Sequence, residues 1–207
     1  MLVKDLSAAA LEERLAEIRR APGERGRVEL VVRRPRERER EILAQGVLDP
    51  VEGLLGDTWR VRGSKQTANG SAHPGMQLTV MSSRAAALVA GPLERWPLAG
   101  DQLYVDFDLS EAALPPGAQL GVGEAIIEIT AQPHLGCAKF AERFGPDALR
   151  LVNSKVGREL RLRGVNTRII VGGVVRPGDA VRKLDGAAQA AGLGLDRLEP
   201  RPGSRAS

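Results

Sequence analysis

The sequence predicts a mainly β protein, a closed or nearly closed barrel with a few peripheral helices. Short runs of alternating apolar and polar residues recur along most of the chain, as expected of half-buried strands. Glycine and proline turns separate these runs, and many short strands with regular turns favour a barrel over a layered α/β fold. The chain has 207 residues, 43% of them hydrophobic and 27% charged, which is enough to enclose a core.

The first 24 residues predict a helix that precedes the barrel. Apolar residues recur at helical spacing over Asp5–Arg20. Asp5 or Ser7 can cap this helix, and Pro22-Gly23 ends it. We therefore expect an N-terminal helix over residues 1–24 as a unit separate from the strands.

Residues 25–184 hold the predicted strands of the barrel domain. Three of them begin at a Gly-Asp turn: Gly56–Val61, Gly100–Val105 and Gly178–Lys183. The first two turns are also candidate site elements, because glycine lets the backbone approach a ligand closely. The remaining strands are expected at Arg27–Val32, Gln77–Met81, Gln119–Val122, Ala125–Thr130 and Thr167–Val175.

Two short helices are expected late in the domain, followed by a tail. The first spans Ala138–Phe144 and ends at Gly145. The second spans Pro146–Val152, where proline suits the first helical turn. Beyond Leu184 the apolar periodicity stops, so residues 185–207 are expected to be weakly ordered.

The charge pattern bears on the partners of the chain. The net charge is +4, and the densest basic run, Arg33–Glu41, interleaves five arginines with three glutamates. This partly cancels the field, so we expect a solvated loop. Aromatic residues make up only 3%, too few for stacking on single strands, so nucleic acid is disfavoured as a partner. No apolar run approaches a membrane span or a signal-peptide core, which with one thiol favours the cytoplasm.

Cys137 is the only cysteine in the chain, and cationic residues surround it. His134, Lys139 and Arg143 all lie within six residues of it. Such neighbours favour the thiolate, the form that attacks sulfur centres or binds a soft metal. The alternative is a small buried hydrophobe, the common fate of a free cysteine. The polar, basic flanks and Gly136 favour the chemical interpretation.

Several segments together resemble a known family. They are Gly53–Trp59, Gly100–Leu103, Leu109–Glu111, Leu114–Gly117, Gly123–Thr130, Pro133–Phe140 and Gly178-Asp179. In this order and spacing they resemble the MOSC domain, the module that also forms the C-terminal part of molybdenum-cofactor sulfurases. The resemblance runs from about Gly26 to Leu184.

The resemblance implies a barrel like that of pyruvate kinase, a molybdenum cofactor, and Cys137 as a persulfide sulfur carrier or molybdenum ligand. His134 would donate a proton or hydrogen-bond the sulfur, although a turn residue at this position explains it equally well. The phosphate of the cofactor calls for guanidinium or ammonium groups. The candidates for that contact are Lys139, Arg143, Arg163 and Arg168, with Arg161 beside them. No pyridoxal phosphate is expected on this chain.

Two activities follow from the resemblance: sulfuration of the cofactor, or reduction of small N-hydroxylated compounds. The first needs a sulfur donor such as a cysteine desulfurase, and the second needs an external electron donor. A carrier or storage protein for the cofactor, without turnover, is an alternative from another class. A barrel that binds a polyanion through its arginines is a third, and the low aromatic content counts against it.

Overall fold

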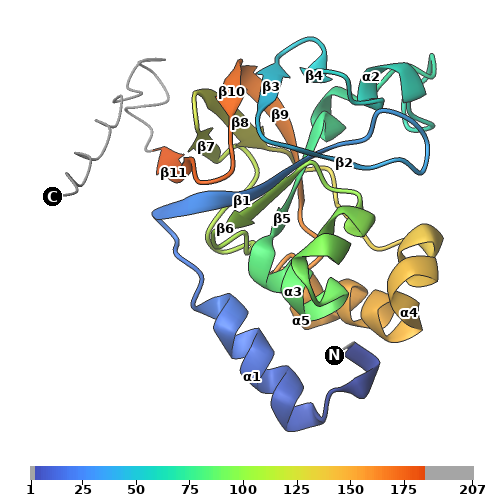
Figure 1. Ribbon diagram of the computed structural model, residues 1–207, viewed down its shortest axis with the longest axis vertical. Coiled ribbons are helices and arrows are strands. Elements are labelled where there is room, and N and C mark those ends of the chain that lie inside the picture. The colour runs from blue at the N-terminus through green and yellow to red at the C-terminus, as the bar shows by residue number, and fades with distance from the viewer. Residues whose placement is uncertain (1–2, 185–207) are drawn as a thin grey trace, which may run out of the picture.

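Seven strands close into a barrel within residues 3–184, the part of the chain that the computed structural model describes (Figure 1). The expected tail at 185–207 lies outside the described residues. Around the ring the strands are β1 (Arg25–Arg33), β6 (Leu103–Asp106), β5 (Leu78–Ser82), β9 (Val165–Val171), β8 (Ala125–Ile129), β7 (Gln119–Val122) and β11 (Ala180–Leu184). Pairing of β11 with β1 closes the ring. Neighbouring strands are antiparallel except β5 and β6. The predicted fold class is therefore confirmed.

Four short strands extend this barrel. β2 (Glu41–Leu43) pairs with β1, whereas β10 (Gly173–Val175), β3 (Gly46–Asp49) and β4 (Gly53–Leu54) form a separate sheet. The single strand expected over Thr167–Val175 is thus divided between β9 and β10. Gly172 stands at the break, where an added Cβ would lie 2.8 Å from the Leu48 carbonyl oxygen.

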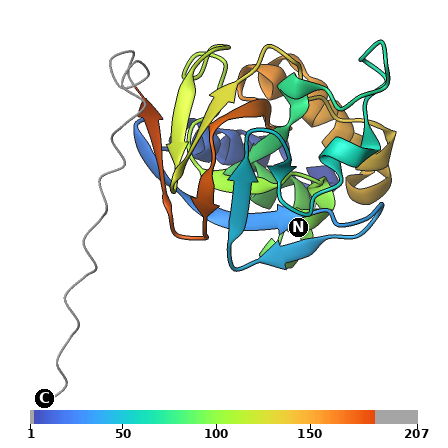
Figure 2. The same ribbon diagram turned by 90° about the horizontal axis from the view of Figure 1, so that it is seen from above.

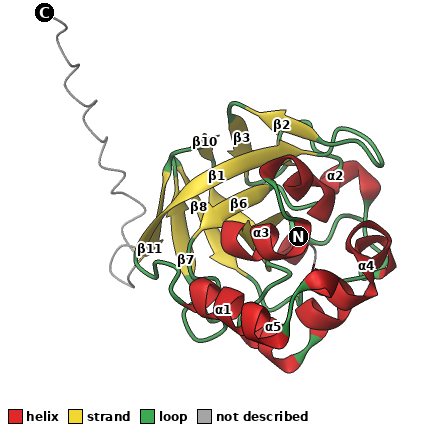
Figure 3. Ribbon diagram, turned by 60° about the horizontal axis from the view of Figure 1, so that its bottom comes forward, coloured by secondary structure: helices red, strands yellow, loops and turns green. Residues whose placement is uncertain are grey.

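The helices gather mainly on one side of the barrel (Figure 3). They are α1 (Ala8–Arg19), α3 (Ser83–Ala90), α4 (Ala138–Asn153) and α5 (Lys155–Glu159), together with the short 3-10 turns η1 (Val3–Asp5), η2 (Pro74–Met76) and η3 (Leu93–Ala99). The Ser7 hydroxyl caps α1, as predicted. α4 is bent at Gly145, whose φ is 88°, so the two expected helices are its two halves. Sequence analysis predicts neither α3 nor η3. Among the described residues, no helix has both the length and the apolar character that a membrane crossing requires.

The strand predicted at Gly56–Val61 is wrong, because this segment contains helix α2 (Trp59–Arg62). Gly56 has a left-handed φ of 78°, and the Asp57 carboxylate accepts the Trp59 backbone N–H at 2.9 Å. These two features turn the chain away from an extended path. The indole of Trp59 is buried, so the apolar residue in the pattern fills the core from a helix rather than a strand.

Two apolar cores result, one inside the barrel and one between the barrel and its helices. On β6, Leu103 and Val105 point into the barrel while Tyr104 faces the helices. The same alternation turns Thr79 of β5 and its cross-strand partner Asn166 of β9 away from the interior. These two polar residues form part of the floor of the site described next.

Candidate functional site

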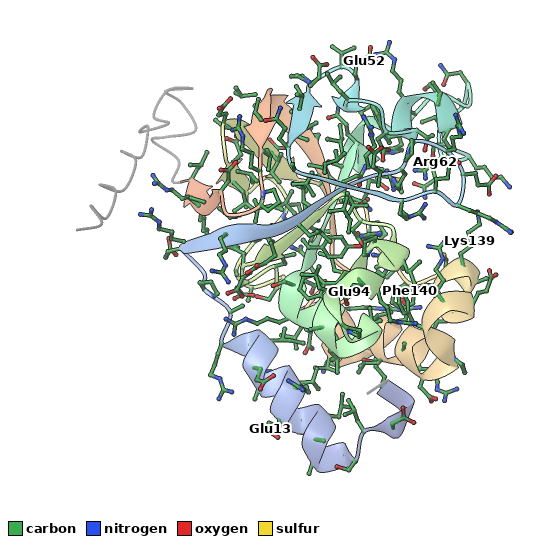
Figure 4. All side chains as sticks on the ribbon, in the orientation of Figure 1. Glu13, Glu52, Arg62, Glu94, Lys139 and Phe140 are labelled. Atoms are coloured by element: carbon green, nitrogen blue, oxygen red, sulfur yellow. The ribbon has the colours of Figure 1, made fainter. Side chains whose placement is uncertain are left out.

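A cavity of about 560 Å³ lies against the outer face of β5 and β9. Its other walls are the connection between β1 and β2, helix α2, the turn before β6, and the start of α4. Arg62 of α2 and Lys139 of α4, both cavity residues, lie on the same side of the molecule (Figure 4). The view from above shows helices α2 and α4 on the side of the molecule away from the end of β11 (Figure 2). Segments as far apart in the sequence as Arg34 and Asn166 thus form one site.

Five of the six residues predicted to act at the site line this cavity: Cys137, His134, Lys139, Arg143 and Arg163. Arg168 does not. It lies on the outer face of β9, where its guanidinium pairs with Glu128 at 2.9 Å. Arg161 is also outside this cavity, because its guanidinium donates to the carbonyl oxygens of Leu109 and Leu114.

Cys137 is exposed, and the segment before it is fastened in place. The Gly136 N–H donates to Asn153 Oδ1 at 2.9 Å, and Asn153 Nδ2 donates back to the Gly136 oxygen at 3.1 Å. A Cβ at Gly136 would lie 2.8 Å from the side chains of Leu149 and Val152. Close packing on α4 therefore positions the thiol, and the alternative of a buried hydrophobic cysteine does not describe this residue.

The arginine-rich run is an exposed loop over residues 36–39, as expected, and it also forms a wall of the cavity. Arg34 is buried, and its Nε and Nη2 each donate to the Asp57 carboxylate at 2.8 Å. Arg36, Arg38 and Arg40, which follow it, line the cavity. Sequence analysis missed these residues because the alternating charges resemble a solvent-exposed loop. The paired Asp57 lies 23 residues away and leaves no local signal.

A second buried ion pair also borders the site. Arg163 donates to Asp101 Oδ2 at 2.6 Å and to the Ala99 carbonyl oxygen at 2.8 Å, and its guanidinium lies over the Phe140 ring at 5.1 Å. Asp57 and Asp101 both follow a glycine in the first two predicted Gly-Asp turns. Each turn places a buried carboxylate that fixes one arginine of the cavity.

Positive charge exceeds negative charge in the lining, which holds eight cationic side chains and one carboxylate, that of Glu37. Burial, followed by the nearby charges of Arg143 and Arg34, lowers the pKa of Arg40. Burial, followed by Arg34, lowers the pKa of Arg62. Among the described residues Arg62 has no carboxylate partner. Like charges held this close in a partly buried cavity are stabilised when an anion binds.

Polar atoms without partners in the part of the chain that the structure describes also belong to residues of the lining. Asn166 Oδ1 and Arg163 Nε are buried and have no hydrogen-bond partner within residues 3–184. Such atoms are costly when left unsatisfied, so they indicate a ligand or ordered water. Within residues 3–184, no three His, Cys, Asp or Glu side chains are arranged to hold a metal ion. Cys137 is the one thiol that this cavity offers a metal, and the thioether of Met76 is the other soft sulfur group in the lining.

The buried imidazole of His134 predicts a loss of stability in acid. Burial, with the charges of Arg163 and Arg34, holds its pKa well below the ordinary 6.5. Below about pH 6.5 the unfolded chain therefore binds a proton that the folded chain refuses. We expect the free energy of unfolding of wild type, relative to His134→Gln, to fall by up to about 1.4 kcal/mol per pH unit in this range. Urea denaturation of both proteins between pH 8 and 5 measures this. A constant difference would contradict the expectation.

Known proteins resemble this chain in fold. No family model and no curated protein matches its sequence. The YuaD protein from Bacillus subtilis has a TM-score of 0.57 at 18% identity, covering 78% of this chain and 97% of its own. A hypothetical protein has a TM-score of 0.53 at 20% identity, and the match covers 83% of this chain and 78% of that protein. YiiM from Escherichia coli has a TM-score of 0.50 at 19% identity, and the match covers 82% of this chain and 80% of YiiM. At these identities the likeness shows the fold alone.

Proposed function

We propose that the cavity binds the molybdenum cofactor and that Cys137 is its sulfur carrier or molybdenum ligand. The observation that carries this proposal is an exposed thiol in a cavity of about 560 Å³ with a large excess of positive charge. The motif resemblance to the MOSC domain and the barrel shared with the solved structures support it. When bound, the cofactor would supply two-electron chemistry and a soft metal centre.

The residues of the cavity suit such a ligand. A phosphate in a partly closed site needs charge-assisted hydrogen bonds, which guanidinium groups give with two parallel donors. Arg62 lines the cavity, is exposed and has no ion-pair partner among residues 3–184, so its donors are available to a ligand. Arg34 and Arg163 are held by carboxylates and give the wall a fixed shape. Cys137 Sγ faces the same cavity without a hydrogen bond among the described residues.

In the sulfuration route the chain performs a thiolate exchange. The Cys137 thiolate attacks the outer sulfur of a donor persulfide, such as that of a cysteine desulfurase. The donor S–S bond breaks, the donor leaves as a thiolate, and Cys137 carries the sulfur as a persulfide. In the reduction route Cys137 is a fixed ligand and an external protein supplies the electrons. Turnover of an N-hydroxylated base with a supplied reductase distinguishes the reduction route from a storage protein, and uptake of sulfane sulfur from a donor persulfide distinguishes the sulfuration route.

A pair of substitutions on one helix tests the phosphate contact. Arg62→Ala is expected to weaken retention of molybdopterin by on the order of 1–3 kcal/mol, the value of one charged hydrogen bond. Arg60→Ala is the matched control, because Arg60 lies on the same helix α2 but pairs with Glu52 and does not line the cavity. Pterin fluorescence after dialysis measures retention. Equal losses from both variants would count against the contact.

A further inference from the structure

Asp101 and His134 meet below the floor of the cavity. Asp101 is fully buried, and one of its oxygens, Oδ2, accepts from Arg163. Its other oxygen, Oδ1, lies 3.6 Å from His134 Nδ1. Both of these atoms are buried, and neither makes a hydrogen bond of good geometry among residues 3–184, since the nearby Thr79 hydroxyl, which also favours the Asp101 carboxylate, donates to Gln102 Oε1. The separation of Oδ1 and Nδ1 is slightly longer than a hydrogen bond, and a small approach would let one proton between the two atoms satisfy both.

The charges around the pair decide which atom carries that proton. Burial raises the pKa of Asp101, but the Arg163 guanidinium at 2.6 Å opposes this and favours the carboxylate, which only accepts. Burial and the charges of Arg163 and Arg34 lower the pKa of His134, so the imidazole is neutral and holds one proton. Placed between them, the proton belongs to Nδ1. The other ring nitrogen, Nε2, then carries a lone pair.

We propose that Asp101 is a positioning residue that fixes His134 as the Nδ1–H tautomer and leaves Nε2 as a hydrogen-bond acceptor open to the Cys137 cavity. Only 13% of the His134 side chain is exposed, and Nδ1 is buried, so the open edge of the ring is the Nε2 edge. His134 lines the Cys137 cavity and a neighbouring cavity of about 550 Å³.

The tautomer constrains the ligand, a consequence that rests on the proposed function of the cavity. The cationic side chains of the lining are donors, whereas His134 Nε2 and Asn166 Oδ1 are acceptors. A ligand that satisfies both sets is anionic at one end and presents an N–H, O–H or S–H group at the other. His134 therefore serves as an acceptor in the cavity that Cys137 also lines, and of its two predicted roles, donating a proton or hydrogen-bonding the sulfur, this tautomer does not fit the first.

Imidazole NMR of the full chain tests the tautomer directly, without any cofactor. The chain has two histidines, so two-bond ¹H–¹⁵N correlations at pH 7.5 are readily assigned with His73→Gln. We expect a protonated Nδ1 and a pyridine-type Nε2 for His134. His73 is an internal reference of the opposite kind, because its Nδ1 accepts the Gly75 N–H at 3.0 Å and its proton must lie on Nε2. A protonated Nε2 on His134 would overturn the proposal.

Two matched variants separate positioning from general stability. Asp101→Asn is expected to abolish the Nδ1–H tautomer of His134. Asp57→Asn removes the equivalent charge from the other Gly-Asp turn, which pairs with Arg34 and does not contact His134, so the His134 spectrum should persist. An unchanged tautomer in Asp101→Asn would refute the positioning role. The wild-type spectrum decides the tautomer even where a variant fails to fold. None of these results depends on molybdenum content, so either proposal can fail alone.

Discussion

Cys137→Ser is expected to eliminate sulfane sulfur and bound molybdenum while leaving the fold intact. An oxygen at this position forms no persulfide and is a poor ligand for a soft metal. The thiol is exposed, so the free energy of unfolding should stay within about 0.5 kcal/mol of wild type. Cyanolysis measures sulfane sulfur, elemental analysis measures molybdenum, and urea denaturation measures stability.

Ala138→Ser is the matched control for this substitution. Ala138 is the exposed neighbour of Cys137 and does not line the cavity, so its variant gains a hydroxyl group but keeps the thiol. It should retain both sulfur and metal at wild-type levels. A Cys137→Ser variant that loses several kcal/mol of stability, beside a wild type with neither sulfur nor metal, would mean that the cysteine is structural.

Arg34→Ala is expected to produce the largest loss of stability, about 3–5 kcal/mol at pH 7, because it leaves a buried charge unpaired. The Asp57 side chain is fully buried. Burial alone would raise the pKa of Asp57, but the hydrogen bonds and charge of Arg34 outweigh burial and lower it. The pair therefore contributes stability above the ordinary carboxyl pKa of 3.8, and this contribution is lost as the pH falls below that value. Urea denaturation at pH 7 measures the loss.

Arg33→Ala controls for a general effect of removing an arginine from this run. Arg33 is the neighbouring residue, and its partner Glu41 is exposed, so the variant should differ from wild type by less than about 1 kcal/mol. The double variant Arg34→Ala with Asp57→Ala should regain part of the loss, because it removes the unpaired charge. Equal stabilities of Arg33→Ala and Arg34→Ala would contradict the importance of the buried pair.

Local pattern was sufficient for most of the barrel and for the cysteine segment. The alternation after Gly100 and Gly178 predicts β6 and β11 because those strands are half-buried on a barrel wall. The segment from His134 to Arg143 converges on one cavity because a helix begins just after Cys137. Strand alternation and the start of a helix both depend on residues that are close together in the sequence, so they can be predicted from it.

The residues that sequence analysis missed depend on contacts between distant segments. Arg34 is held at the site by the buried carboxylate of Asp57, which lies 23 positions later in the sequence. The residues next to Arg34 do not indicate this pairing. Arg168 lies in a similar arginine-rich segment yet does not line the cavity, because it is the cross-strand partner of Glu128 on β8 and pairs with its carboxylate. The sequence feature that could have indicated the arginines of the site is the pair of Gly-Asp turns. A carboxylate buried in such a turn needs a cation beside it, and Asp57 and Asp101 each pair with an arginine of the cavity.

The most direct test of the cavity as a cofactor site is the molybdenum and pterin content of the wild-type protein. It would be produced in a host that makes the molybdenum cofactor, purified without chelators, and analysed for metal by mass spectrometry and for pterin by fluorescence. We expect molybdenum and pterin to elute with the protein in equal amounts, and both to fall in Arg62→Ala but not in Arg60→Ala. Wild-type protein that carries neither molybdenum nor pterin would contradict the proposed function.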